Sequence, residues 1–245
     1  RAFDYYFGPR LPNMKIKDFL TSSVASYNLV IYYIKDKEFQ IETYDTWRTS
    51  GGVKDLSDHV DISRATRVTP SIPSVINFKH SDTKTINNDK FNDLFGRYYG
   101  NAEVTSIGDG ESLTYETVFS LILFDKKGDY LFGYCHDKGN DPIYDEAVVF
   151  YYTGIETATV DWSDETAVTS YKLVNNYWAA GTDAAVTPTH SLCFDSEINP
   201  WTTNEEATSL FYVYYQGYYS VILSRKLRVF NYDAYLSDTT IQSLK

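Results

Sequence analysis

The sequence has 245 residues and a net charge of -11. This length is enough for one large β domain or for two smaller ones with real hydrophobic cores. The negative charge argues against binding to DNA, RNA or anionic membranes, because those partners need a basic surface. We therefore expect no direct sequence-specific nucleic-acid partner. We also expect no membrane insertion, since no apolar run approaches the length of a membrane-spanning helix.

Aromatic content is the unusual feature of the composition, with 23 Tyr, 14 Phe and 4 Trp. Tyrosine is a large amphipathic side chain that suits both sheets and interfaces. The composition therefore favours a rigid, β-rich protein that meets its partners through broad surfaces. The chain starts with Arg1 rather than Met, and we expect the natural termini to lie elsewhere.

Residues 1–14 are predicted to form an irregular N-terminal arm, because Gly8-Pro9 and Pro12-Asn13 interrupt regular structure. Apolar arms of this kind often lie on a neighbouring subunit, although a terminal strand is an equally good interpretation. The candidate interface residues are the aromatic side chains of this arm, Phe3, Tyr5, Tyr6 and Phe7.

A helix and a hairpin are predicted next. Residues 15–27 carry apolar side chains three and four positions apart, which is typical of an amphipathic helix. Residues 29–34 are strongly β-forming, Asp36-Lys37 turns the chain, and residues 39–44 alternate like a returning strand. The helix face expected to pack consists of Ile16, Phe19, Leu20, Val24 and Tyr27.

A second short amphipathic helix is predicted within residues 87–100. It follows residues 73–80, which alternate apolar and polar side chains like a half-buried strand. Asn87 or Asn88 is expected to cap the helix, and Gly96 to end it. The helical spacing predicts a single core-facing set, Phe91, Leu94 and Phe95.

Residues 115–124 are apolar almost throughout, which predicts a central strand covered on both faces. Residues 153–200 are rich in Thr, Asp, Ala and Asn, and they indicate a strand-and-loop insertion or a domain seam. The other predicted strands are residues 62–68, 130–135, 147–152 and 227–235.

A third helix is predicted over residues 205–223. Thr202 and Thr203 each precede a Glu by three residues, which is the capping-box spacing. The aromatic residues and Gly217 of this segment would also suit a strand. The side expected to pack carries Leu210, Tyr214, Tyr218 and Val221, and Ser237 is expected to cap a final helical turn.

The residues typical of metal sites are scattered. His59, His80, His136 and His190 lack zinc-binding spacing, so each is interpreted as a surface or hydrogen-bonded histidine. Asp137, Asn140 and Asp141 could collect oxygens around Ca²⁺, but a plain turn rich in Asp and Gly is the favoured interpretation. Cys135 and Cys193 are interpreted as two buried free thiols, and a single bridge between them stays open.

No nucleophile elbow, phosphate-binding loop or dinucleotide motif is present. We therefore predict no catalytic, cofactor-binding or metal-binding residues, no cofactor, and a protein that is not an enzyme. Two aromatic segments could stack on sugars, but anchoring of a loop is the favoured interpretation of both, Asp161-Trp162 and Asn176-Tyr177-Trp178.

Several segments follow one another in a definite order. They are Lys15-Ile16-Lys17-Asp18-Phe19-Leu20, Tyr27-Asn28-Leu29-Val30-Ile31, Ile41-Glu42-Thr43-Tyr44-Asp45-Thr46-Trp47, Lys54-Asp55-Leu56-Ser57, Val60-Asp61-Ile62, the strand ending in Phe78, Tyr99-Gly100, Gly133-Tyr134-Cys135, Val148-Val149-Phe150-Tyr151-Tyr152, and the run from Arg228 to Leu236. This order resembles virion structural proteins of tailed bacteriophages, of the tail-hub or baseplate-hub type. The resemblance spans residues 15–245, and residues 153–200 fit it least well.

The resemblance implies a non-enzymatic component of the virion that joins the tail tube or connector to distal tail proteins. The implied partners are other virion tail proteins and further copies of the chain in a ring-like homo-oligomer. The expected fold class is β-rich α+β, with mainly antiparallel sheets or β-barrel-like modules and a few short peripheral helices.

The expected division is an N-terminal arm at 1–14, a mixed helix/β hub-like domain at 15–152, an insertion or seam at 153–200, and a helix plus strand completing the fold at 201–245. The alternative function is an extracellular glycan-binding β-sandwich module that uses aromatic stacking platforms. A glycoside hydrolase is a third possibility, because 33 acidic residues always allow a pair of carboxylates to be proposed.

Overall fold

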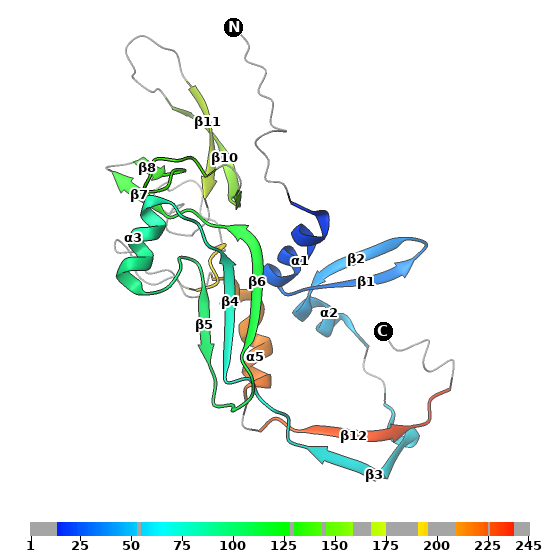
Figure 1. Ribbon diagram of the computed structural model, residues 1–245. Coiled ribbons are helices and arrows are strands. Elements are labelled where there is room, and N and C mark those ends of the chain that lie inside the picture. Colours follow the sequence, from blue (N-terminus) through cyan, green and yellow to red (C-terminus); the bar gives the residue numbers. More distant parts are fainter. Residues whose placement is uncertain are drawn as a thin grey trace.

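A mixed four-stranded sheet in the order β5-β4-β6-β9 lies at the centre of the computed structural model (Figure 1). The structure describes residues 14–52, 55–127, 130–143, 146–158, 168–174, 191–195, 209–224 and 226–237. Strand β4 pairs antiparallel with β5 and parallel with β6, and β6 pairs parallel with β9. The four strands are β4 (Val75–Ser81), β5 (Ala102–Thr105), β6 (Leu113–Ser120) and β9 (Ala147–Val148).

Four two-stranded antiparallel sheets surround this centre. None of the sheets in the described parts of the chain closes into a barrel, and the predicted β-rich α+β class is confirmed. The pairs are β1 (Leu29–Lys35) with β2 (Glu38–Thr43), β3 (Val60–Val68) with β12 (Val229–Ala234), β7 (Phe124–Lys127) with β8 (Tyr130–Gly133), and β10 (Tyr151–Ala158) with β11 (Val168–Val174).

The β1–β2 hairpin forms where the sequence predicts it. Its two turn residues, Asp36 and Lys37, have φ angles of 37° and 68°. Two successive residues with positive φ match the backbone twist of the flanking strands, as in type I′ turns. Short helices follow at α2 (Tyr44–Ser50) and at the 3₁₀ turn η2 (Ser57–His59).

Helix α1 (Ile16–Tyr27) packs on β6 through buried small polar residues as well as through part of the predicted apolar face, since the Phe19 ring lies 5.7 Å from that of Phe119. Ser22 and Ser26 are buried, and the Val118 N–H donates to Ser22 Oγ at 3.0 Å. These serines lie one helical turn apart on the same face, and their small side chains allow close approach of the helix to the strand. The prediction of a packed face is therefore wrong for Ile16 and Leu20, which are exposed, whereas Phe19 is half exposed and still contacts Phe119.

The predicted third helix is confirmed as a helix, but its buried face is shifted by one residue. Tyr215 and Tyr219 are buried in place of Tyr214 and Tyr218, and Val221 is exposed. The reason is the π-helical segment η4 (Phe211–Tyr215), which precedes α5 (Gln216–Ile222). A π turn inserts one extra residue, so positions beyond it rotate relative to those before it. The predicted start at residues 205–208 and the cap at Thr202 and Thr203 lie outside the described residues.

Phe78 of β4 joins the sheet to this C-terminal helical segment. It is fully buried, and its ring stacks on Tyr115 of β6 at 5.1 Å between centroids. The same ring contacts one aromatic residue from the 191–195 segment and three from η4 and α5, with centroid distances between 4.7 and 6.1 Å: Phe194, Phe211, Tyr215 and Tyr219. One side chain of β4 thus contacts β6, the segment 191–195 and the C-terminal helical segment.

Helix α3 (Ile86–Phe95) ends at Gly96 as predicted, with φ of 67° in the left-handed region. The cap is Thr85, whose Oγ1 accepts from the Asn88 N–H, because the helix begins before both predicted caps. Of the three side chains predicted to face the core, only Phe91 is buried. Leu94 is 79% exposed and Phe95 is 53% exposed. Helical spacing places side chains on one face, but it does not determine how wide the covered face is.

Asn88 has a structural role that its sequence position does not reveal. Its Nδ2 donates to Leu121 O at 2.8 Å, and its Oδ1 accepts from the Leu123 N–H at 2.8 Å. The amide therefore bonds to the chain after β6 as a neighbouring strand would, and it fixes α3 beside the sheet.

Strand β6 itself is covered on both faces only near Phe119 and Ser120. The predicted double coverage is wrong at Glu116 and Val118, which are exposed.

Replacing Phe78 with Ala is expected to lower the free energy of unfolding by about 3–5 kcal/mol, from lost transfer energy plus the cavity left among five rings. The control is Phe95→Ala, which removes a half-exposed ring whose contact with Phe91 is worth about 1 kcal/mol. Urea unfolding of both variants makes the comparison. Equal losses would contradict the assignment of Phe78 as the centre of the core.

Candidate functional site

The predicted interface residues Phe3, Tyr5, Tyr6 and Phe7 lie outside the described residues. The same holds for the two candidate sugar-stacking segments, which contain Trp162 and Trp178, and for His190 and the helical turn expected after Ser237. The structure therefore leaves these predictions as they stand.

His80 is the most unusual polar group of the core. It is buried, its Nδ1 lies 2.8 Å from Thr117 Oγ1, and its Nε2 lies 2.9 Å from Leu192 O. A carbonyl oxygen only accepts, so Nε2 carries the proton and Nδ1 accepts from the Thr117 hydroxyl. The prediction that this histidine is hydrogen-bonded is confirmed. Burial lowers the pKa of His80 from 6.5 to about 4, and the bond to Leu192 opposes this shift without cancelling it.

The segment 191–195 is held against the sheet by the same residue. The His80 ring stacks on Phe194 at 4.5 Å between centroids, and the Phe194 N–H donates to Gly100 O at 2.7 Å. Gly100 has φ of 83°, and a Cβ there would lie 2.6 Å from Leu121 Cδ1. The site therefore needs glycine for both its backbone angle and its space. This arrangement is structural, because its polar groups bond to one another inside the core.

The acidic turn at 137–141 is a closed hydrogen-bonded loop. Asp137 Oδ1 accepts from the Gly139 N–H at 2.8 Å and from the Asp141 N–H at 2.9 Å. Lys138 pairs with Asp89 at 3.2 Å and with Asp93 at 3.5 Å, which fastens the turn to α3. Within the described ranges, no group of three or more His, Cys, Asp or Glu residues is placed to hold a metal ion.

Both cysteines lie in the described part of the chain, and neither forms a disulfide. Cys193 is buried, in agreement with the prediction. Cys135 is exposed, so the prediction of a buried thiol is wrong there. The physical reason is that β8 ends at Gly133, which leaves Cys135 in the connection that follows rather than in a covered strand.

Two of the elements that carry exposed apolar side chains project from the body, and neither group of side chains was predicted from the sequence. The first, called here the hairpin surface, belongs to the β1–β2 hairpin. It consists of Ile31, Tyr33, Ile34, Phe39 and Ile41. The second, called the ribbon, is the β3–β12 pair, whose exposed apolar side chains are Val68, Val229, Phe230 and Tyr232. Large exposed apolar groups of this kind mark interaction surfaces.

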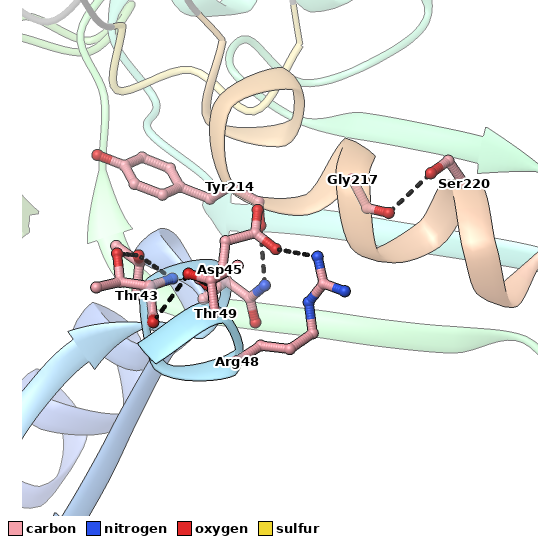
Figure 2. Close-up of polar contacts among 9 residues, drawn as sticks. Thr43, Asp45, Arg48, Thr49, Tyr214, Gly217 and Ser220 are labelled. Atoms are coloured by element: carbon pink, nitrogen blue, oxygen red, sulfur yellow. Dashed lines mark hydrogen bonds and ion pairs between the residues drawn. The ribbon is translucent and has the colours of Figure 1, made fainter. Parts of the chain in front are cut away.

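The hairpin surface is rigidly attached to the body. Asn28, directly after α1, donates from Nδ2 to Tyr214 O at 2.8 Å, and the Tyr215 hydroxyl donates to Ala25 O at 2.5 Å. Figure 2 shows α2 beside α5, where a Cβ on Gly217 would lie 3.4 Å from Asp45 Oδ2. Thr43 caps α2 by accepting from the Thr46 N–H. These contacts attach the base of the hairpin to the body, from which the hairpin projects (Figure 1).

No helix in the described segments is both long and apolar enough to cross a membrane. Comparison with known proteins gave no match to a family model, to a curated protein or to a solved structure.

His80 is expected to make stability depend on pH. Its pKa is about 4 when folded and 6.5 as the ordinary value, so the unfolded chain binds the proton more readily. The stabilisation by His80 is complete above pH 6.5 and falls by about 3 kcal/mol as the pH drops to 4. The free energy of unfolding of wild type minus that of His80→Gln should therefore shrink over this range. The control is His59→Gln, at an exposed site. An equal pH dependence of the free energy of unfolding in the two variants would contradict the role assigned to His80.

Proposed function

We propose that this chain is a non-enzymatic structural protein of a bacteriophage virion, a tail-hub or baseplate-type component that joins the tail tube or connector to distal tail proteins. The proposal combines the order of segments along the sequence with one structural observation. That observation is the distribution of exposed apolar side chains over separate projecting elements, namely the hairpin surface and the ribbon.

A subunit that sits between several neighbours needs several apolar contact surfaces that point in different directions. The hairpin surface and the ribbon belong to different two-stranded sheets, and both extend from the central sheet (Figure 1). A two-stranded sheet alone is marginally stable, so a partner that covers it would add stability as well as contact. The arrangement therefore supports a role for this chain as a subunit of a larger assembly.

A glycan-binding module would need a different arrangement of exposed aromatic side chains. A sugar binder concentrates exposed aromatic rings with amide and acid neighbours in one groove. The exposed aromatic side chains of the described residues are instead spread over the hairpin, α3 and the ribbon, as with Phe39, Phe95 and Phe230. This spread favours assembly over sugar stacking. The net charge of -11 also suits a conduit for DNA, since like charges repel.

We expect the protein to form a ring-like homo-oligomer, or to enter a larger particle, through interfaces that bury more than about 1,000 Å². Replacing Ile31 and Ile41 together by Thr should reduce the mass measured by light scattering, because these exposed residues lie directly opposite on the hairpin. Threonine keeps the strand propensity, so the melting temperature should change little.

The matched control replaces Lys35 and Glu38 by Gln, which changes another directly opposed, exposed pair on the same hairpin without altering net charge. A wild-type protein that stays monomeric at micromolar concentration would contradict the proposal. Turnover of a polysaccharide that is lost on changing one acidic residue would favour the hydrolase instead.

A further inference from the structure

The β1–β2 hairpin leaves one apolar face uncovered. Ile31 lies directly opposite Ile41, and Tyr33 lies directly opposite Phe39, with their ring centroids 5.7 Å apart. Because side chains two positions apart on a strand share a face, the two pairs form one continuous patch within the hairpin surface. The four side chains are between 45% and 64% exposed. A patch of this kind on an exposed strand pair gains stability when another chain covers it.

The opposite face of the hairpin is polar and less exposed. Tyr32, Gln40 and Glu42 alternate with the residues of the patch and are half-buried, and Gln40 Nε2 donates to Glu42 Oε1. A half-buried antiparallel strand pair usually turns its polar face to water and its apolar face to the core. The hairpin does the reverse, which indicates that its apolar face is a contact surface.

Neither edge of the hairpin has a strand partner among the described residues, since β1 and β2 pair only with each other. An extended segment can add a strand to such an edge, where main-chain bonds give affinity and alternate side chains give specificity. To continue the apolar patch, the added strand must carry large apolar side chains at every second position.

The N-terminal arm has this pattern. Phe3, Tyr5 and Phe7 stand at alternate positions, so an extended arm would present all three rings on one side. Such rings bury about 150–250 Å² each, so three of them bring a large part of the roughly 1,000 Å² that a specific interface needs. The arm also carries Arg1 and Arg10 against a single acidic residue, in a chain whose net charge is -11. Its charge therefore favours contact with a second copy, whose body is acidic.

We propose that the N-terminal arm of a second copy of this chain docks on the hairpin as an added strand, with Phe3, Tyr5 and Phe7 continuing the apolar patch. The inference rests on the proposed function, because it requires self-association, and it names the two surfaces that meet. The contact is head-to-tail, since the arm of each copy binds the hairpin of the next, and such contacts generate a ring when the rotation closes.

Two full-length variants, each defective on one side of the contact, test the docking. The arm variant carries Phe3→Ser, Tyr5→Ser and Phe7→Ser, and the hairpin variant carries Ile31→Thr and Ile41→Thr. In sedimentation velocity, each variant alone should be a monomer. An equimolar mixture should form a dimer of one copy of each and nothing larger. The intact arm of the hairpin variant then binds the intact hairpin of the arm variant, while the remaining arm and hairpin are both defective.

A matched pair of single substitutions tests the alternation along the arm. Tyr5→Ser removes a ring from the side that docks, whereas Tyr6→Ser removes the same ring from the other side. The first should weaken the association about tenfold more than the second does, because large losses come from buried aromatic residues. Equal weakening by the two substitutions would contradict an added strand.

A mixture that stays monomeric, with both variants shown to be folded by circular dichroism melts, would overturn the arm contact. An arm variant that keeps the wild-type mass would overturn it as well. If that variant also melts at a lower temperature, the arm binds the hairpin of its own chain. The proposed function survives these outcomes as long as the wild-type protein assembles, because it requires association but not this contact. A wild-type protein that stays monomeric would contradict both.

Discussion

The structure depends on the burial of one aromatic ring, Phe78, at the centre of the mixed sheet. Its ring lies between the two central strands and the segments that cover them, and it contacts residues more than 130 positions away along the chain, including Tyr215 at 4.7 Å. Burying a large aromatic side chain contributes a few kcal/mol, and its ring contacts add to this. Without this contact, the C-terminal helical segment would lose its main attachment to the sheet.

Polar groups then decide how the covering segments are placed around that ring. His80 holds the segment 191–195, Asn88 holds α3 beside the end of β6, and the Tyr215 hydroxyl holds the end of α1. Each of these bonds is buried or partly buried, where a lost partner costs more than the bond itself contributes. The apolar core therefore provides most of the stability, while these bonds fix the geometry from which the hairpin and the ribbon project.

The projecting elements are where the core has least influence and where function is expected. The six residues of β12 are all exposed, and the β1–β2 hairpin presents apolar residues that the body leaves uncovered. Exposed apolar strands invite pairing with other chains unless a specific partner covers them.

The sequence by itself determined the elements: α1, the β1–β2 hairpin with its two-residue turn, the end of α3 at Gly96 and the class of the fold. These elements follow from the local spacing of apolar residues and from turn chemistry, both of which a short stretch of sequence contains. Only the tertiary structure decided which faces are covered. Ser22 is buried against β6 while Leu20 of the predicted apolar face is exposed, a π turn moves burial from Tyr214 to Tyr215, and Leu94 stays exposed. Burial depends on what residues distant in the sequence bring alongside, and the ribbon itself joins strands that lie more than 160 residues apart.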